Sequence, residues 1–321
     1  MLTLDGVSKI YRVGAFGGGE LPAVRDVSFT IGNGEVVSLI GESGSGKSTI
    51  GKMILRLIGI NGGSITFGST DISGLKGPQV RDYYREVQGV FQDPFSSCNP
   101  IFKVEHIFSL VKGSYFSSLP QAEWRTKVEA ALSSVGLEAG QVLHKYPHQL
   151  SGGQVQRLLI ARTLLLDTKL LVADEIISML DASTRIDVLN LLADLKARGL
   201  GILFITHDLS LGNYISERTV ILRRGRVVEM GRTAKVFGDP RHPYTRMLIA
   251  SVPQLHKRWG NEAAVDPGPC PVHAGRGAVG SVFSPAKGAR GSAAIAPSEL
   301  VELDAEHSVA CFHVDEGAPC A

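Results

Sequence analysis

The stretch Glu35-Val-Val-Ser-Leu-Ile-Gly-Glu-Ser-Gly-Ser-Gly-Lys-Ser48 joins an apolar run to a glycine-rich loop. Residues 35–40 have the length and the apolar character of a buried β-strand. Apolar side chains then recur at helical spacing over residues 48–58, which predicts a helix there. The pattern G-x-x-x-x-G-K-S between a strand and a helix is typical of loops that bind phosphate groups.

The chemistry of phosphate binding explains the residue types in this loop. Glycines let the backbone curl so that successive N–H groups point at phosphate oxygens, and the N-terminus of the following helix adds its positive dipole end. We expect Lys47 to bridge the β- and γ-phosphates of a nucleotide and Ser48 to hold Mg²⁺. The alternative is a glycine turn that binds nothing. The residues expected to bind the nucleotide here are Gly41, Ser43, Gly44, Ser45, Gly46, Lys47, Ser48 and Thr49.

The composition is that of a globular protein with little net charge. The chain has 321 residues, 44% of them hydrophobic, and 33 Lys and Arg against 31 Asp and Glu give a formal net charge of +2. A charge this small recruits neither nucleic acid nor an anionic membrane surface. Asp5 interrupts the start where a secretory signal needs an apolar run, and the apolar stretch 163–173 is too short to span a bilayer. We therefore expect no export, no membrane-spanning segment and no nucleic-acid partner.

Short apolar runs alternate with helical patterns, which predicts an α/β fold. Residues 170–173 and 201–206 have the continuous apolar character of strands that are buried on both faces. Between them, the pattern over residues 183–198 predicts an amphipathic helix. The predicted apolar side of that helix consists of Ile186, Leu189, Leu192 and Leu195.

The pattern changes at two places along the chain. From about residue 99 to residue 166 it is mostly helical and interrupts the series of strands, so we expect an inserted helical subdomain. Residues 275–296 are rich in Gly, Ala and Ser and have little periodicity, which argues against a packed core there. We therefore predict a main domain over residues 1–255 and a partly irregular C-terminal extension over residues 256–321.

Two carboxylates directly follow the apolar run 170–173. Asp174 and Glu175 are expected at the carboxyl edge of a buried strand, where α/β sheets hold their ligands. We expect Asp174 to reach Mg²⁺, directly or through water, and Glu175 to act as general base on the attacking water. A helix N-cap or a solvated pair of acids is the alternative.

A second glycine turn, Leu150-Ser-Gly-Gly-Gln154, opens an amphipathic helix upstream of these acids. This pentapeptide resembles the signature of ATP-binding cassette (ABC) ATPases, and the resemblance extends over residues 1 to about 255. Four further positions agree with that family in order and spacing. They are Tyr11 as the adenine-stacking aromatic, Gln92 in the Q-loop, Asp181 in the D-loop and His207 as the switch histidine. Taken singly, they have ordinary alternatives: Tyr11 as a packing residue, Gln92 as a surface amide and His207 as a structural histidine after a strand.

The resemblance implies a RecA-like P-loop NTPase fold, with a mainly parallel sheet, an antiparallel β subdomain and the helical insertion. It also implies that two such subunits meet head to tail around ATP. The ATP on Lys47 of one subunit would then be capped by the other subunit's Ser151, Gly152, Gly153 and Gln154. His207 would contact the γ-phosphate, Asp181 would couple the two sites, and Gln92 would link the nucleotide state to the helical subdomain. Mg²⁺, bound with ATP, would be held by Ser48, Gln92 and Asp174.

The sequence departs from the family pattern at two positions. Ile176 stands where the family usually has proline after the glutamate, and Val155 replaces a frequent arginine after the signature glutamine. Loss of the proline is expected to loosen the loop that leads to Asp181. Both carboxylates are retained, so we still predict an active ATPase.

A further segment, Arg241-His-Pro-Tyr-Thr245 followed by Ser251-Val-Pro253, resembles the one that follows the ATP domain in importers of dipeptides, oligopeptides and nickel. This resemblance implies peptide uptake, with import of nickel or oligosaccharide, or a non-transport regulatory role, as alternatives. The implied partners are a second ATPase subunit, itself or a homologue, two transmembrane permeases and, indirectly, an extracytoplasmic solute-binding protein. The chain would then lie peripherally at the cytoplasmic face of the membrane.

The four cysteines are Cys98, Cys270, Cys311 and Cys320. Many members of the subfamily carry a C-terminal iron–sulfur cluster, and Cys270-Pro-Val-His273 and His307-Ser-Val-Ala-Cys311 resemble the two ends of its binding segment. The family's two middle cysteines are missing between them, and a [4Fe–4S] cluster normally takes four ligands. Cys320 and His273 are the replacements that the sequence offers. We therefore expect reduced thiols and no cluster.

Overall fold

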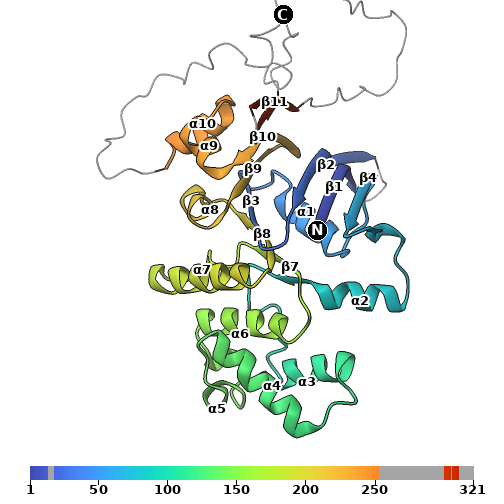
Figure 1. Ribbon diagram of the computed structural model, residues 1–321, viewed down its shortest axis with the longest axis vertical. Helices are drawn as coiled ribbons and strands as arrows, with labels where there is room; N and C mark the ends of the chain where they lie inside the picture. The colour runs from blue at the N-terminus through green and yellow to red at the C-terminus, as the bar shows by residue number, and fades with distance from the viewer. Residues whose placement is uncertain (14–17, 253–299, 305, 311–321) are drawn as a thin grey trace, which may run out of the picture.

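The computed structural model describes residues 1–13, 18–252, 300–304 and 306–310 (Figure 1). Two sheets organise these residues, and a helical segment lies below the larger sheet in the view of Figure 1. The predicted α/β fold, with its mainly parallel sheet, its antiparallel sheet and its inserted helices, is confirmed.

The larger sheet has eight strands in the order β11-β12-β10-β9-β3-β8-β7-β6, and the five strands from β9 to β6 are parallel. Every residue of β3, β7 and β8 is buried. The prediction of strands buried on both faces is therefore confirmed. The strands are β3 (Val36–Ile40), β6 (Val87–Val90), β7 (Leu170–Asp174), β8 (Gly201–Thr206), β9 (Arg218–Arg223), β10 (Arg226–Arg232), β11 (Leu300–Asp304) and β12 (His307–Ala310).

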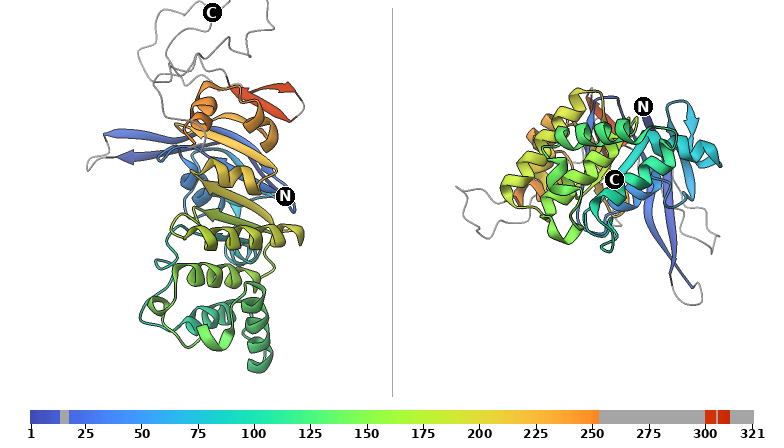
Figure 2. Two further views of the ribbon diagram at one scale, coloured as in Figure 1. Left: turned by 90° about the vertical axis from the view of Figure 1, so that its left-hand side faces the viewer. Right: turned by 90° about the horizontal axis from the view of Figure 1, so that it is seen from below.

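The smaller sheet is antiparallel, with the order β2-β1-β4-β5. Its long β1–β2 hairpin extends away from the body of the molecule (left view of Figure 2). Apolar residues of this sheet pack with α1 and with the larger sheet in one core cluster. The strands are β1 (Leu2–Val13), β2 (Gly19–Ile31), β4 (Gly62–Phe67) and β5 (Thr70–Asp71).

Four helices, α3 to α6, follow one another between β6 and β7 and form the helical insertion. The helices of the described residues are α1 (Lys47–Ile54), α2 (Pro78–Glu86), α3 (Val104–Tyr115), α4 (Gln121–Ser134), α5 (Ala139–Val142), α6 (Gly152–Leu164), α7 (Ala182–Ala197), α8 (Leu209–Ile215), α9 (Thr233–Gly238) and α10 (Pro243–Ala250), with 3₁₀ turns at Ile72–Gly74 and Pro147–Gln149. No helix in these described ranges is long and apolar enough to cross a membrane.

Two helix predictions need correction. Helix α1 ends at Ile54 and not at residue 58, because Leu55 caps it and Arg56 turns into the left-handed region with φ of 52°. In α7, Ile186 is 44% exposed and does not share the buried face. That face consists of Val188, Leu189, Leu192 and Leu195. Ile186 has the spacing of that face but lies one turn before its first buried leucine, near the start of α7, where the side chain stays exposed.

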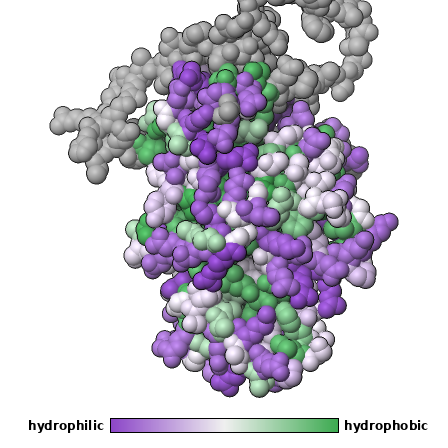
Figure 3. All heavy atoms as spheres, in the orientation of Figure 1, coloured by the Kyte–Doolittle hydropathy of each residue, from purple (hydrophilic) through white to green (hydrophobic). Residues whose placement is uncertain are grey.

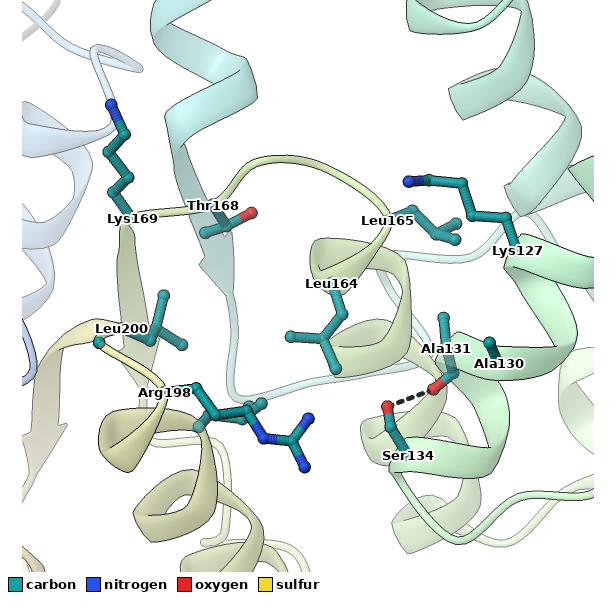
Figure 4. Close-up of a pocket in the computed structure, with 12 residues that line it drawn as sticks. Lys127, Ala130, Ala131, Ser134, Leu164, Leu165, Thr168, Lys169, Arg198 and Leu200 are labelled. Atoms are coloured by element: carbon teal, nitrogen blue, oxygen red, sulfur yellow. Dashed lines mark hydrogen bonds between the residues drawn. The ribbon is translucent and has the colours of Figure 1, made fainter. Parts of the chain in front are cut away.

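The helical insertion meets the sheet around a cavity of about 460 Å³ (Figure 4). Its wall includes Leu164 and Leu165 at the end of α6 and Leu200 at the start of β8, while Lys127 and Arg198 lie at its rim (Figure 4). Figure 3 shows an apolar area in the same lower part of the molecule, among otherwise mixed polar and apolar residues. This pocket opens to the surface, whereas buried residues of the helical insertion and of the sheet share one core cluster.

Part of the predicted C-terminal extension continues the larger sheet. Strand β12 pairs antiparallel with β10, placing Val309 opposite Glu229. Glu229 is fully buried, and its carboxylate accepts the N–H groups of Arg241 at 2.8 Å and His242 at 2.9 Å. The ring Nε2 of His307, on β12, lies 2.8 Å from the same carboxylate. A buried carboxylate is costly unless it is paired, and these partners supply the pairing.

His242 is the N-cap of α10 and is 1% exposed. Its Nδ1 accepts the N–H of Tyr244 at 3.1 Å, which requires that nitrogen to be unprotonated. Burial, followed by the positive charge of Arg223, lowers the pKa of His242 from 6.5 to about 4. Between pH 6.5 and about pH 4, His242 therefore binds a proton in the unfolded chain but not in the folded chain. The contribution of His242 to stability is therefore fully present above pH 6.5 and is lost as the pH drops towards 4.

We predict that His242→Asn makes the stability of the protein less sensitive to acid. Asparagine keeps an acceptor for the Tyr244 N–H but has no titrating ring. Between about pH 7 and about pH 5, the free energy of unfolding of the unchanged protein should fall by about 2 kcal/mol more than that of the variant. Urea unfolding at the two pH values measures this difference, and equal losses in both proteins would contradict the prediction.

Candidate nucleotide-binding site

The loop between β3 and α1 requires glycine at defined positions. A Cβ on Gly41 would lie 2.1 Å from the carbonyl oxygen of Leu222 in β9. Gly46 has φ of 108°, and a Cβ there would lie 2.5 Å from the carbonyl oxygen of Ala23. Gly44 also has positive φ, 79°. The glycines therefore allow both the curl of the loop and its close approach to neighbouring backbone.

Lys47 folds back over this loop. Its Nζ donates hydrogen bonds to the carbonyl oxygens of Gly41 at 2.7 Å and Glu42 at 2.8 Å. The side chain is buried, and this burial lowers the pKa of the ammonium, while Glu175, Asp174 and Glu42 oppose the shift. A cation held at the mouth of a loop of backbone N–H groups is suited to phosphate oxygens.

Ser48 and Asp174 form a pair of oxygen donors beside Lys47. The Ser48 hydroxyl, in the first turn of α1, donates to Asp174 Oδ1 at the end of β7 over 3.2 Å. Burial raises the pKa of Asp174, while the Ser48 hydrogen bond and Lys47 counteract it. Hydroxyl and carboxylate oxygens are ligands that Mg²⁺ takes together with nucleotide phosphates, so this pair fits the ion.

The other residues predicted to bind the nucleotide lie on several different elements. Gln92 is exposed and follows β6, the strand next to β7. Thr49 is half-buried in the first turn of α1, whereas Ser43 is exposed and Ser45 is buried. Tyr11 lies towards the far end of β1, with Lys9 Nζ 5.5 Å from its ring centroid. The Lys9 ammonium therefore lies over one face of the Tyr11 ring in a cation–π contact.

The structure brings the two predicted catalytic residues together. Glu175 follows β7 with φ of 51°, an uncommon conformation, and its N–H donates to the carbonyl of Ile205 in β8 at 2.9 Å. His207 follows β8, and its Nδ1 lies 3.3 Å from Glu175 Oε1. Parallel β7 and β8 end at the same edge, which is why these residues meet.

Other contacts support the loop after Glu175, although Ile176 stands where the family usually has proline. Ile176 and Ile177 are 1% and 2% exposed and belong to the main core cluster. The Ser178 N–H and hydroxyl both donate to the carbonyl of Glu175, at 3.1 and 2.9 Å. Burial and these hydrogen bonds hold the turn that proline usually holds. Val155, at the other departure, is also buried in this cluster.

The signature residues and Asp181 form a second group at the N-termini of α6 and α7. Ser151 and Gln154 cap α6 reciprocally: the Gln154 N–H donates to Ser151 Oγ at 3.2 Å, and the Ser151 N–H donates to Gln154 Oε1 at 3.0 Å. A Cβ on Gly153 would lie 2.4 Å from the methyl carbon of Thr184 in α7. Gly152, the first residue of α6, completes the turn.

Asp181 is the N-cap of α7. Its carboxylate accepts the Ser183 hydroxyl at 2.6 Å and the Thr184 N–H and hydroxyl at 3.0 and 2.9 Å. These hydrogen bonds, that from Ser183 first, hold the pKa of Asp181 well below its usual range. Thr184 thus contacts both Asp181 and the signature glycine Gly153, which joins the two motifs in one surface.

Sequence reasoning missed a contact from the C-terminal side of the domain. The Glu42 N–H donates to Tyr244 Oη in α10 at 3.1 Å, and the Arg223 guanidinium lies 5.0 Å from the Tyr244 ring centroid. The Gly225 N–H donates to the Ser45 carbonyl at 2.8 Å. The sequence marked the segment 241–245 only by its resemblance to importers, and its spacing carries no signal of this contact.

The predicted cysteine chemistry falls mostly outside the described residues. Cys270, His273, Cys311 and Cys320 lie there, while His307 pairs with Glu229. Cys98 is buried, and burial raises the pKa of its thiol. Within the described ranges, no group of three or more His, Cys, Asp or Glu side chains is arranged to hold a metal ion.

Comparisons with known proteins identify relatives of both parts of the chain. Residues 24–178 match the family described as ABC transporter, and residues 228–285 match the C-terminal region of oligopeptide/dipeptide transporters. The oligopeptide transport ATP-binding protein OppF of Streptococcus mutans is 43% identical over 236 residues, 73% of this chain and 76% of that protein. The dipeptide transport ATP-binding protein DppF of Lactococcus lactis is 43% identical over 234 residues, 72% of this chain and 75% of that protein.

Solved structures agree with these relatives. The ATP-binding cassette MJ0796, a dimer in a post-hydrolysis state with ADP and phosphate, aligns with a TM-score of 0.65 at 28% identity, over 73% of this chain and 99% of that chain. The protein cbiO1 of Clostridium perfringens, part of the cbiONQ transporter complex, aligns with a TM-score of 0.64 at 26% identity, over 74% of this chain and 90% of that chain.

We predict that Gly41→Ala weakens ATP binding at least about tenfold, because the new methyl group meets backbone that cannot move aside without opening the loop. Gly74→Ala is the control, since a Cβ at Gly74 meets no described atom within 4 Å. Titration of both variants with a fluorescent ATP analogue measures the dissociation constants. Unchanged affinity in a folded Gly41→Ala protein would refute the role assigned to this glycine.

We predict that Glu175→Gln lowers steady-state ATP hydrolysis about 100-fold or more and leaves ATP binding intact, because the amide cannot accept the proton of the attacking water. Phosphate release and nucleotide affinity are measured on the same preparation. Glu129 is an exposed acid of α4, and the control variant Glu129→Gln should hydrolyse ATP at the original rate. A variant at Glu175 that still hydrolyses ATP at near the original rate would rule out the general-base role.

Proposed function

Because this chain belongs to the ABC transporter family, in which it is an ATP-hydrolysing importer subunit, we propose that it powers the uptake of peptides through permease partners. The observation that carries this proposal is the group formed by Lys47, Ser48, Asp174, Glu175 and His207 at one edge of the larger sheet. The match of residues 228–285 to the C-terminal region of oligopeptide/dipeptide transporters supports peptides as the solute.

We propose the following division of labour for hydrolysis. The loop N–H groups and Lys47 bind the phosphates of ATP, and Lys47 exchanges its two loop carbonyls for phosphate oxygens. Ser48, Asp174 and Gln92 would hold Mg²⁺, which would neutralise charge on the phosphates when bound. Glu175 orients water and accepts its proton. His207, beside Glu175, contacts the γ-phosphate, and Tyr11 stacks on adenine.

We propose that a second cassette completes each site. The N–H groups at the start of α6, from Gly152 and Gly153, and the Ser151 hydroxyl are suited to the γ-phosphate of ATP bound to the partner. Asp181, joined to this surface through Thr184, couples the two sites. The dimeric state of the cassette MJ0796 supports this arrangement. The partner is a second copy of this chain or a homologous subunit.

The proposed contact with a membrane permease lies beside the Gln92 loop. A groove of about 420 Å³ is lined there by residues that include Phe102, Leu110 and Arg162, between α3 and α6. Phe102 and Leu110 are 44% and 59% exposed, and their neighbour Ile101 is 76% exposed. Such a set of exposed apolar side chains favours a protein partner. An apolar segment of the permease would bind in this groove. Gln92, in the neighbouring loop, would then link the nucleotide state to that segment.

The permeases would hold the chain at the cytoplasmic face of the membrane, with a solute-binding protein on the opposite side. Purification of the tagged chain from native membranes in mild detergent tests this assembly. The expected stoichiometric partners are two permeases and a second cassette subunit. Recovery of soluble partners alone would contradict the transport function.

Peptide uptake itself is tested in cells from which this chain has been deleted. Uptake of a radiolabelled dipeptide or oligopeptide should be lost and should return when the unchanged gene, but not the Glu175→Gln variant, is supplied. Retained peptide uptake with loss of nickel or oligosaccharide uptake would transfer the proposal to that solute. If no uptake is lost, the regulatory alternative replaces transport.

We predict that Leu110→Asp reduces co-purification with the permeases about tenfold or more, because it places a charge in the apolar groove. Leu57→Asp is the matched control, since Leu57 is 56% exposed after the end of α1 and does not line the groove. Quantitative mass spectrometry of the purified complexes compares the two. Equal recovery of permeases with both variants would place the docking surface elsewhere.

A further inference from the structure

The peptide unit between Gly41 and Glu42 is held from both sides. Its carbonyl oxygen, on Gly41, accepts a hydrogen bond from Lys47 Nζ at 2.7 Å, and its N–H, on Glu42, donates to Tyr244 Oη at 3.1 Å. A peptide unit is planar, so fixing the direction of its N–H also fixes the direction of its carbonyl group. Tyr244 therefore helps to set where the Lys47 ammonium rests.

The carbonyl of Glu42 strengthens this link between Tyr244 and the loop. It accepts Lys47 Nζ at 2.8 Å and the Ser45 N–H at 3.1 Å. Tyr244 thus anchors the residue on which the lysine and the tip of the loop both depend. The bond comes from outside the loop, since Tyr244 belongs to α10, about 200 residues further along the chain.

Tyr244 is itself held firmly. It is 3% exposed, its ring is covered by the Arg223 guanidinium, and its N–H donates to His242 Nδ1. The backbone before it is fixed by the buried Glu229 carboxylate, which accepts the N–H groups of Arg241 and His242. A hydroxyl on so restricted a ring presents its acceptor in one direction, which a solvent molecule does not.

The Glu229 carboxylate also ties α10 to the C-terminal hairpin. His307 Nε2 lies 2.8 Å from it, and the pairing of β12 with β10 brings His307 there. A continuous series of hydrogen bonds therefore runs from His307 through Glu229, His242 and Tyr244 to Glu42 in the phosphate-binding loop.

We propose that Tyr244 is a positioning residue for ATP binding: its hydroxyl holds the Gly41–Glu42 peptide so that Lys47 and the loop are arranged for the phosphates before the nucleotide arrives. The proposal deepens the proposed function and rests on ATP binding at this loop. Tyr244 acts on the binding of ATP and not on the chemical step. Its contacts are with Glu42, His242 and Arg223, and not with the catalytic candidates Glu175 and His207. Its loss should change affinity for ATP and leave the chemical step nearly intact.

Tyr244→Phe tests this directly, because it removes one oxygen and keeps the ring beside Arg223. We expect the dissociation constant and the KM for ATP to rise about three- to tenfold, with kcat within about twofold of the original value. Tyr83→Phe is the matched control: Tyr83 is 5% exposed and donates to the Ile54 carbonyl at the far end of α1. It should leave the KM unchanged, and a thermal melt of each variant separates affinity from stability.

Each outcome decides the proposal. An unchanged KM in Tyr244→Phe would overturn it. The proposal would also fail if the KM of both tyrosine variants rose in proportion to the fall in their Tm, because the effect would then be one of stability. If Tyr244→Phe does not fold, His307→Ala replaces it, and a KM raised about twofold or more supports the proposal, whereas an unchanged KM overturns it. Absence of ATP binding by the unchanged protein would instead contradict the proposed function.

Discussion

The site depends on one backbone constraint: between β3 and α1 the chain must turn sharply against β9, with no space for a side chain at Gly41. This turn places the carbonyl groups of Gly41 and Glu42 within hydrogen-bond distance of Lys47 Nζ, next to the start of α1. A turn of this kind binds anions because its dipoles are already oriented, so binding requires little reorganisation. The buried strands β3, β7 and β8 hold the turn and the acids in one frame.

Much of this site could be predicted from local sequence. A strand buried on both faces has a continuous apolar run, and its last residues in a parallel sheet end at the ligand edge. Asp174 and Glu175 were placed there on that ground, and the parallel pairing of β7 with β8 brings His207 beside Glu175. The roles of the signature residues and Asp181 in a dimer remain predictions, since a single chain shows them only as helix caps.

What the sequence could not reveal depends on contacts between distant residues. Glu229 reads as an ordinary polar residue of a strand, yet it is fully buried, because backbone N–H groups from α10 and the His307 ring meet it. Strands β11 and β12 lie in an extension that the sequence predicts to be partly irregular, and no local pattern shows that β12 pairs with β10 and β11 with β12. Ile186 has the right spacing for the buried face of α7, but burial is decided by what packs against the helix.

The central claim is that the Lys47 ammonium, held over the glycine loop, is the main contact for the phosphates of ATP. Equilibrium dialysis of ATP against the purified chain and its Lys47→Ala variant tests this most directly. Loss of charged hydrogen bonds to phosphate predicts that the variant binds ATP about 10- to 100-fold more weakly. Equal affinity of the two proteins, with both folded, would contradict the account.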